Sequence, residues 1–141
     1  MMQGKGFTDR ALLENEVRDI LAAGTDIERI AGKNILVLTP DSTRTAPLGM
    51  MVRAIADIIG AHAARLDFMV ALGTHQPMDE EEILSLYGLT REEKAALLPD
   101  SLFMNHRWDL EGTLVKIGRL GEDEVEEISG GLFRQGVDVV I

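Results

Sequence analysis

Three short segments of the chain bring together side chains that hold anions and move protons. Hydroxyls, arginines and backbone N–H groups bind phosphate or carboxylate, and a histidine takes up and returns a proton near neutral pH. Each segment directly follows an apolar run, which is where a buried strand would end. The segments are "PDSTR" at residues 40–44, "GTHQPM" at 73–78 and "NHRW" at 105–108.

The first segment supports two interpretations. In one, Asp41, Ser42 or Thr43 caps the next helix by accepting backbone N–H groups, and Pro47 lies in its first turn. A cap needs only one such residue. In the other, the hydroxyls and N–H groups hold a phosphate or carboxylate, and Arg44 adds a bidentate clamp. The residues alone leave both interpretations open.

The second segment places His75 in a loop after Gly73, which allows a sharp turn. His75 is either a loop histidine bonded to the backbone or a general acid and base. For the second role, Asp41 at the neighbouring strand exit would fix its tautomer. Arg44 would then hold a substrate carboxylate beside it.

The third segment and the remaining histidine are less specific. Asn105 and His106 would complete the wall of a site and Trp108 would cover it, or His106 bonds to backbone and Trp108 packs at the edge. His62 falls on the apolar face at the end of a helix, where we expect it to pack or to favour the helix C-terminus. The acidic runs "DEEE" and "EDEVEE" are typical of solvated faces and helix starts, so no metal ligands are assigned.

The elements that must position these segments alternate between strands and helices. Apolar spacing predicts helices over 7–24, 47–64, 78–88 and 90–99. Thr8 or Asp9 is the expected start of the first helix and Gly24 its end. The third and fourth helices carry capping-box patterns, Asp79 with Glu82 and Thr90 with Glu93.

Short apolar runs predict strands over 34–40, 65–73, 101–106, 113–120, part of 122–129 and 137–141, with a short helix within 130–136. The continuous run of the first strand suggests burial on both faces. This order predicts an α/β fold of Rossmann-like type, a mostly parallel sheet flanked by helices. In such sheets ligands bind beyond the carboxyl ends of the strands.

Length and composition set the broad class. The chain has 141 residues, enough for one domain spanning 1–141, and it contains no cysteine for a disulfide or thiolate metal site. A net charge of −10 argues against a nucleic-acid partner. No apolar run spans a bilayer and the start lacks a signal-peptide core, so we expect an intracellular, cytoplasmic protein without a membrane partner.

The three segments, with the longer stretch "ALGTHQPMDEEE", together resemble the N-terminal domain of the nickel-pincer-dependent lactate racemase family. Their order, spacing and placement agree from about residue 34 to the end. The chain ends on "VDVVI", a core-like strand, so we expect it to be one half of a two-domain protein. The partner would be its own C-terminal domain.

The resemblance implies a racemase or epimerase of 2-hydroxy acids. The family's cofactor is a nickel pyridinium-3,5-bisthiocarboxylate mononucleotide, which accepts a hydride from C2 and returns it. His75 corresponds to the first of two catalytic histidines. Asp41, Ser42, Thr43 and Arg44 correspond to the loop that contacts the cofactor, and Arg44 would also orient the substrate carboxylate.

Other expectations follow from where the resemblance stops. The second catalytic histidine, the lysine anchor and the nickel-binding histidine are expected beyond this chain, so the fragment alone should be inactive. Thr45 after Arg44, and Gln76 in "THQP", depart from the family pattern and leave the substrate open among 2-hydroxy acids and sugar acids. An alternative is a stand-alone phosphate- or carboxylate-binding module without redox chemistry, and a third option is a regulatory or assembly domain.

Overall fold

The structure is a computed structural model that describes residues 4–113, 118–121, 123, 124 and 127. The chain divides into two compact units, Met1–Arg107 and Trp108–Ile141. The expected strands over 113–120, 122–129 and 137–141 and the helix within 130–136 lie partly or wholly outside the described residues. The elements of the first unit are, in order, α1 Glu14–Gly24, α2 Ile27–Ile30, β1 Asn34–Pro40, α3 Leu48–Ile55, the π-helical turn η1 Ala56–Gly60, β2 Arg65–Ala71, α4 Glu80–Leu86, α5 Arg91–Leu97 and β3 Phe103–Asn105.

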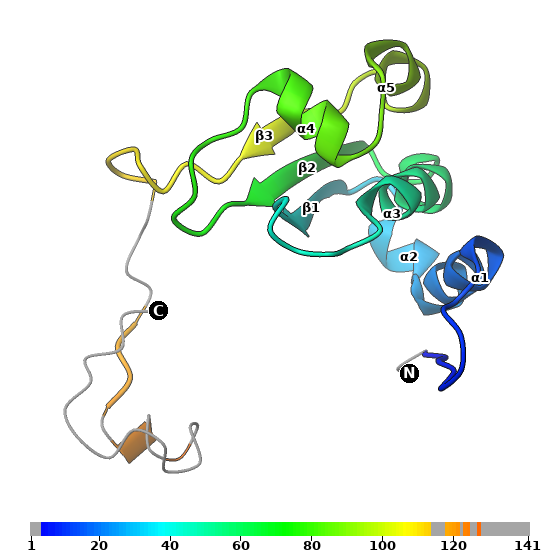
Figure 1. The fold of residues 1–141 in the computed structure, drawn as a ribbon, viewed down its shortest axis with the longest axis horizontal. Helices are drawn as coiled ribbons and strands as arrows, with labels where there is room; N and C mark the ends of the chain where they lie inside the picture. Colours follow the sequence, from blue (N-terminus) through cyan, green and yellow to red (C-terminus); the bar gives the residue numbers. More distant parts are fainter. Residues whose placement is uncertain (1–3, 114–117, 122, 125–126, 128–141) are drawn as a thin grey trace. The chain divides into compact units, whose positions relative to one another are not determined.

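The three strands form one parallel sheet in the order β1-β2-β3, flanked by helices, as the sequence predicts (Figure 1). Each pair of neighbouring strands is joined through helices. Because right-handed crossovers between consecutive strands return on the same side, the connecting helices pack against one face of this sheet. The fold is therefore α/β, with its core between that face and the helices.

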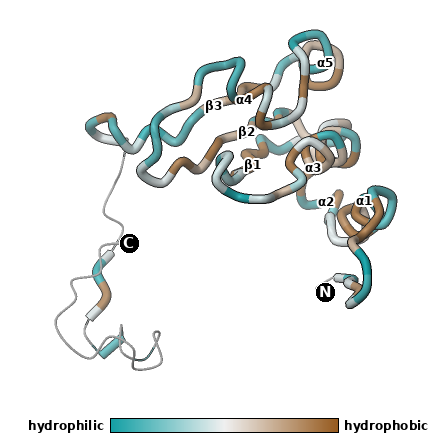
Figure 2. The backbone as a smooth tube through the Cα atoms, in the orientation of Figure 1, coloured by the Kyte–Doolittle hydropathy of each residue, from teal (hydrophilic) through white to brown (hydrophobic). Residues whose placement is uncertain are grey.

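Three aromatic side chains form the centre of the core. Phe68 of β2 lies between Tyr87 and Phe103, with ring centroids 5.9 and 5.5 Å away, and the Tyr87 and Phe103 rings meet edge to face at 5.0 Å. The Tyr87 hydroxyl lies 2.9 Å from the Thr39 hydroxyl, so the end of α4 is tied to β1. Figure 2 shows apolar residues, in brown, along β1 and β2.

The other face of the sheet is more open than the sequence suggests. Leu36 and Leu38 of β1 are 50% and 66% exposed, and Leu102 before β3 is 51% exposed. The prediction that the first strand is buried on both faces is therefore wrong. The consecutive strand order explains it, since the connecting helices cover only the face that carries Phe68 and Val70, both fully buried.

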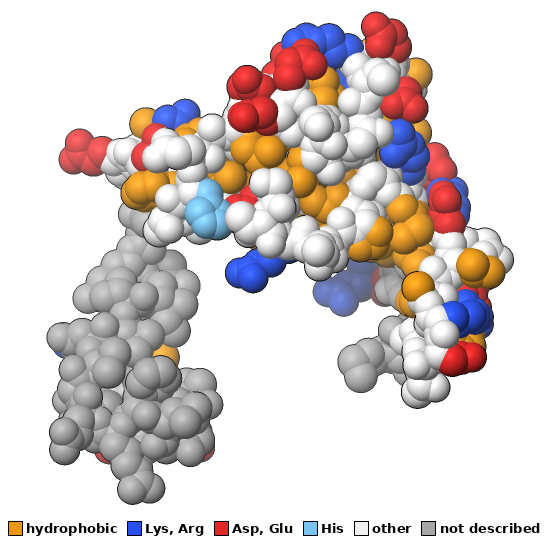
Figure 3. Space-filling model, in the orientation of Figure 1, with side chains coloured by type: hydrophobic (Ala, Val, Ile, Leu, Met, Phe, Trp, Pro, Cys, Tyr) orange, Lys and Arg blue, Asp and Glu red, His pale blue; other side chains and the backbone are white. Residues whose placement is uncertain are grey.

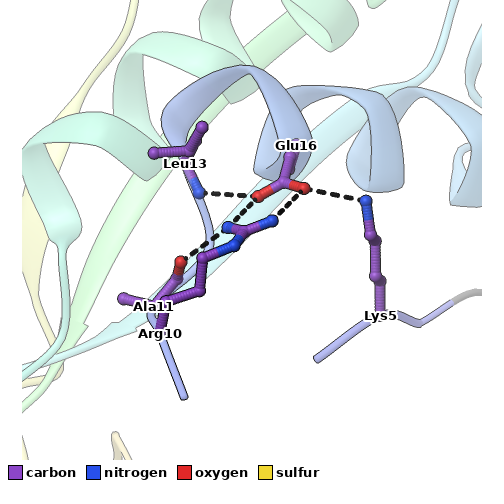
Figure 4. Close-up of polar contacts among 5 residues, drawn as sticks. All are labelled: Lys5, Arg10, Ala11, Leu13 and Glu16. Carbon is purple, nitrogen blue, oxygen red and sulfur yellow. Dashed lines mark hydrogen bonds and ion pairs between the residues drawn. The ribbon is translucent and has the colours of Figure 1, made fainter. Parts of the chain in front are cut away.

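Helix α1 begins later than predicted, at Glu14 rather than after Thr8 or Asp9. Glu16 in the first turn of α1 binds several nearby polar groups (Figure 4). Its carboxylate accepts hydrogen bonds from the Leu13 backbone N–H at 3.0 Å, from Lys5 at 2.8 Å and from Arg10 at 2.6 and 2.9 Å. These partners fix the helix start, and the helix ends at Gly24 as predicted.

The predicted helix over 47–64 is shorter in the structure. It runs as α3 and then loosens into the π-helical turn η1, which ends at Gly60. His62 follows this turn with an exposed side chain, so it does not pack. It lies just after the helix end, where the other expected role, favouring the helix C-terminus, stays a prediction. No helix in the described part of the chain is long and apolar enough to cross a membrane.

Helices α4 and α5 begin as their sequences predict. Both capping boxes are formed. The side chains of Asp79 and Thr90 accept hydrogen bonds from the backbone N–H groups of Glu82 and Glu93. In return, the carboxylates of Glu82 and Glu93 accept hydrogen bonds from the backbone N–H groups of Asp79 and Thr90. Figure 3 shows acidic side chains gathered over these two helices. The run "DEEE" is thus a solvated helix start, as expected, with Glu81 paired to Arg91.

Candidate functional site

The three segments whose side chains could do chemistry leave the sheet at one edge. In the parallel register Thr39 of β1 is level with Val70 of β2, and Val70 is level with Asn105 of β3. The strands therefore finish side by side, and the following loops share the carboxyl edge of the sheet. This is the edge where α/β sheets bind ligands.

Asp41 is the buried carboxylate of this edge, 6% exposed. Its Oδ1 accepts the Thr43 backbone N–H at 3.1 Å and the Thr43 hydroxyl at 2.6 Å, and its Oδ2 contacts Nδ1 of His75. The Thr43 hydroxyl first, and then His75, lower the pKa of Asp41 from 3.8 to about 2. Asp41 is therefore ionised throughout the physiological pH range.

The helix-cap interpretation of this segment is wrong. Helix α3 starts at Leu48 after Pro47, and no side chain caps it. Asp41 instead closes a local turn around Thr43, well before the helix. The loop therefore has polar groups beyond what the helix start requires.

His75 is held from two directions. Its backbone N–H donates to the Leu72 carbonyl at 3.0 Å, across a turn in which Gly73 takes a φ of +61°. Its ring meets Asp41, as the sequence analysis anticipated. An ionised carboxylate can only accept, so Nδ1 must carry the proton and donate it. The side chain is 57% exposed, so the ring reaches solvent while Asp41 does not.

Ser42 and Arg44 lie on the same loop with exposed side chains. The Arg44 backbone N–H donates to the Asp41 carbonyl at 3.3 Å, which continues the turn. An exposed guanidinium and hydroxyl suit a phosphate or carboxylate. Asp41 fits such a ligand poorly, because it is buried, negative and already bonded through both oxygens.

The third segment contributes in a way that sequence reasoning missed. The side-chain amide of Asn105 accepts the Met78 backbone N–H at 3.2 Å and donates to the Met78 carbonyl at 2.7 Å. The His106 backbone N–H donates to the Val70 carbonyl at 2.9 Å and so extends the sheet. Trp108 belongs to the second unit. The only sequence cue to the Asn105 contact is its position at the end of a strand beside the histidine loop.

The surroundings of the edge are open and acidic. A hollow of about 560 Å³ next to the loops is lined by Ser42, Met78, Glu81, Glu82, Ser85 and Leu86. Among the residues that the structure describes, no three histidine or acidic side chains are grouped to hold a metal ion. The part of the edge that the structure describes thus presents an exposed hydroxyl and an exposed guanidinium next to a histidine paired with a carboxylate.

Comparison with known families matches most of this chain to a known domain. The family model of the lactate racemase N-terminal domain matches residues 9–129, which is most of the chain. The chain belongs to this family. Lactate racemase is an isomerase, and the matched domain is its N-terminal one. The match includes all three exit segments, so the resemblance seen in the sequence is confirmed.

A solved structure supports the fold of this lactate racemase N-terminal domain. The crystal structure of a protein from Thermotoga maritima is 24% identical, with a TM-score of 0.64 over 86% of this chain. The chain spans 28% of the length of that protein. No curated protein matches this chain.

Proposed function

We propose that this domain supplies one part of the active site of a lactate-racemase-type enzyme that inverts the configuration at C2 of a 2-hydroxy acid. The observation that carries the proposal is the contact between ionised Asp41 and the exposed ring of His75 at the carboxyl edge of the sheet. Membership of the lactate racemase family supports it.

His75 would act as the acid and base for the substrate hydroxyl. The Nδ1–H group donates a hydrogen bond to Asp41. The other ring nitrogen, Nε2, would therefore take the proton of the substrate hydroxyl and later return it. The negative charge of Asp41 stabilises the ring when it becomes a cation. Positioned acid–base groups of this kind contribute about 10²- to 10⁴-fold to a rate.

Arg44 would hold the substrate carboxylate through paired hydrogen bonds, which fixes the hydroxyl relative to His75. The cofactor of the family, a nickel pyridinium-3,5-bisthiocarboxylate mononucleotide, supplies a hydride acceptor when bound. Ser42 and Arg44 would hold its phosphate or carboxylate groups. Thr43 would support the loop, since its hydroxyl is bonded to Asp41.

Asp41 would serve the site through His75 rather than through a direct cofactor contact. The other catalytic histidine, the lysine anchor and the nickel ligand would come from a further domain, which would also exclude water from the cleft. On this proposal the present chain alone has no racemase activity. The substrate is a 2-hydroxy acid, with Thr45 and Gln76 as the residues where its identity would be tuned.

The test uses the full-length enzyme loaded with the nickel cofactor and a panel of enantiopure 2-hydroxy acids, followed by loss of optical purity. We expect one or more acids to racemise, and His75→Ala to reduce the rate by about 10²- to 10⁴-fold. Normal turnover in His75→Ala would exclude the acid–base role. If no acid racemises while Arg44-dependent binding of inorganic phosphate persists, the chain is a binding module instead.

A further inference from the structure

We propose that Asn105 is a positioning residue for His75, acting through the loop that joins β2 to α4. Its meaning for catalysis rests on the proposed function, but the positioning itself does not. The side chain comes from β3, whereas His75 follows β2 and its carboxylate partner follows β1. Residues at the ends of all three strands would thus hold or position one imidazole ring.

The contact is two-sided. Asn105 uses its amide oxygen and its amide nitrogen on the carbonyl and N–H of one residue, Met78. Neighbouring strands pair their backbones with this donor–acceptor combination, and a side-chain amide reproduces it. Aspartate lacks the donor and leucine lacks both groups, so the contact depends on the amide itself.

The loop between the two fixed points is short. It is fixed at its start by the His75 N–H bond to Leu72, and at its end by Asn105 on Met78. Asp79 directly follows and begins α4 with its capping box. Only Gln76 and Pro77 lie between the two anchored residues, His75 and Met78, so a shift of Met78 is transmitted to His75.

The side chain of His75 is 57% exposed, so packing alone constrains its ring weakly. Its orientation therefore depends on hydrogen bonds and on the path of the loop. Both polar atoms of the Asn105 side chain are engaged with Met78. Asn105 acts on the histidine through this backbone contact.

The first readout is independent of turnover. In the complete chain labelled with ¹⁵N, the ring nitrogens of His75 report which one carries the proton, and amide hydrogen exchange reports the Met78 bond. We expect wild type to show Nδ1 protonated at mildly alkaline pH. Asn105→Ala should lose about tenfold protection at the Met78 amide and shift His75 toward a mixture of tautomers.

Asn105→Asp serves as the second variant, since it keeps the oxygen that accepts the Met78 N–H and loses the donor to the Met78 carbonyl. We expect it to retain amide protection and still disturb the His75 tautomer. Ser101→Ala is the control, because Ser101 is a buried polar residue shortly before the same strand and should leave His75 unchanged.

Unchanged His75 ring signals in Asn105→Ala and Asn105→Asp would overturn the proposal, whatever happens to stability. In the loaded full-length enzyme, we expect Asn105→Asp to lower kcat about tenfold with a smaller change in KM. If wild type shows no racemase activity but the ring signals respond to Asn105, the proposed function fails and the positioning role stands.

Discussion

Two carboxylates in this domain, Glu16 and Asp41, each accept several hydrogen bonds, and they differ in the chemistry of the groups that donate them. Glu16 is bound by the two permanent cations Arg10 and Lys5, which hold its pKa well below its usual range. Asp41 is bound by a neutral hydroxyl and by His75. The side chains are 12% and 8% exposed, so burial alone does not separate them.

The difference lies in the partners. Glu16 raises the pKa of Arg10, whose guanidinium stays charged, so that cluster fixes the start of α1. The partner of Asp41 is instead an imidazole, which in its neutral form donates through one ring nitrogen and accepts through the other. A carboxylate thus acts as an anchor when cations surround it, and in the proposed function it supports proton transfer through an imidazole partner.

The substitution expected to break the Asp41 side of this comparison most strongly is Asp41→Asn in the loaded full-length enzyme. We expect kcat to fall about 100-fold, because the neutral amide no longer stabilises a charged His75 ring and permits the other tautomer. Initial rates of racemisation across pH give the measurement. A rate within about twofold of wild type would remove Asp41 from the mechanism.

Arg44→Ala tests whether the exposed cation of the same loop binds an anion. Loss of charge-assisted hydrogen bonds should reduce kcat/KM about 30-fold, chiefly through KM, and Arg44→Lys should recover only part of it. Arg91→Ala is the matched control, since Arg91 pairs with Glu81 on the acidic helices. Equal effects of Arg44→Ala and Arg91→Ala would point to general charge rather than to this loop.

Acid unfolding sharpens the comparison without catalysis. The folded-state pKa of Asp41 is about 2, below its ordinary 3.8, so at intermediate pH the unfolded chain binds more protons than the native one. Asp41 therefore contributes stability above about pH 4, and this contribution is lost as the pH falls toward 2. Denaturant unfolding of wild type and Asp41→Asn should give free energies that differ at pH 6 and converge near pH 2. A difference independent of pH would contradict the assigned ionisation.

Glu16→Gln is expected to have the smallest effect. Its partners Lys5 and Arg10 are 50% and 40% exposed, and ion pairs with such side chains contribute little and are screened by salt. We therefore expect a slight, salt-sensitive loss of stability and a racemisation rate within about twofold of wild type. Thermal unfolding at low and high salt measures the first effect, with Glu14→Gln as a control in the same helical turn. A large loss of activity in Glu16→Gln would mean that the anchor cluster also supports the site.

Local patterns predicted much of the fold. The capping boxes of α4 and α5 follow from short stretches of sequence, because their hydrogen bonds join residues close in the chain. The three strands follow from short apolar runs, although their ladders join residues far apart in the chain. The late start of α1 was not predicted, because it depends on the hydrogen bonds of Glu16 with Lys5 and Arg10. These bonds favour a start beside Glu16 over one capped by Thr8 or Asp9. The open face of β1 was missed because an apolar run does not reveal which side the crossovers take.

For the site, the sequence by itself determined the chemical groups and their placement at three strand exits. A parallel sheet then brings Asp41 and His75 to one edge, although they lie 34 positions apart in the chain. The Thr43 bonds to the other oxygen of Asp41 form a local turn, two residues along the chain. Tertiary structure alone decided that Asp41 contacts the ring and that the Asn105 amide hydrogen-bonds the Met78 backbone. Those outcomes depend on loop paths and side-chain rotamers, which are set only when the three strands are packed together.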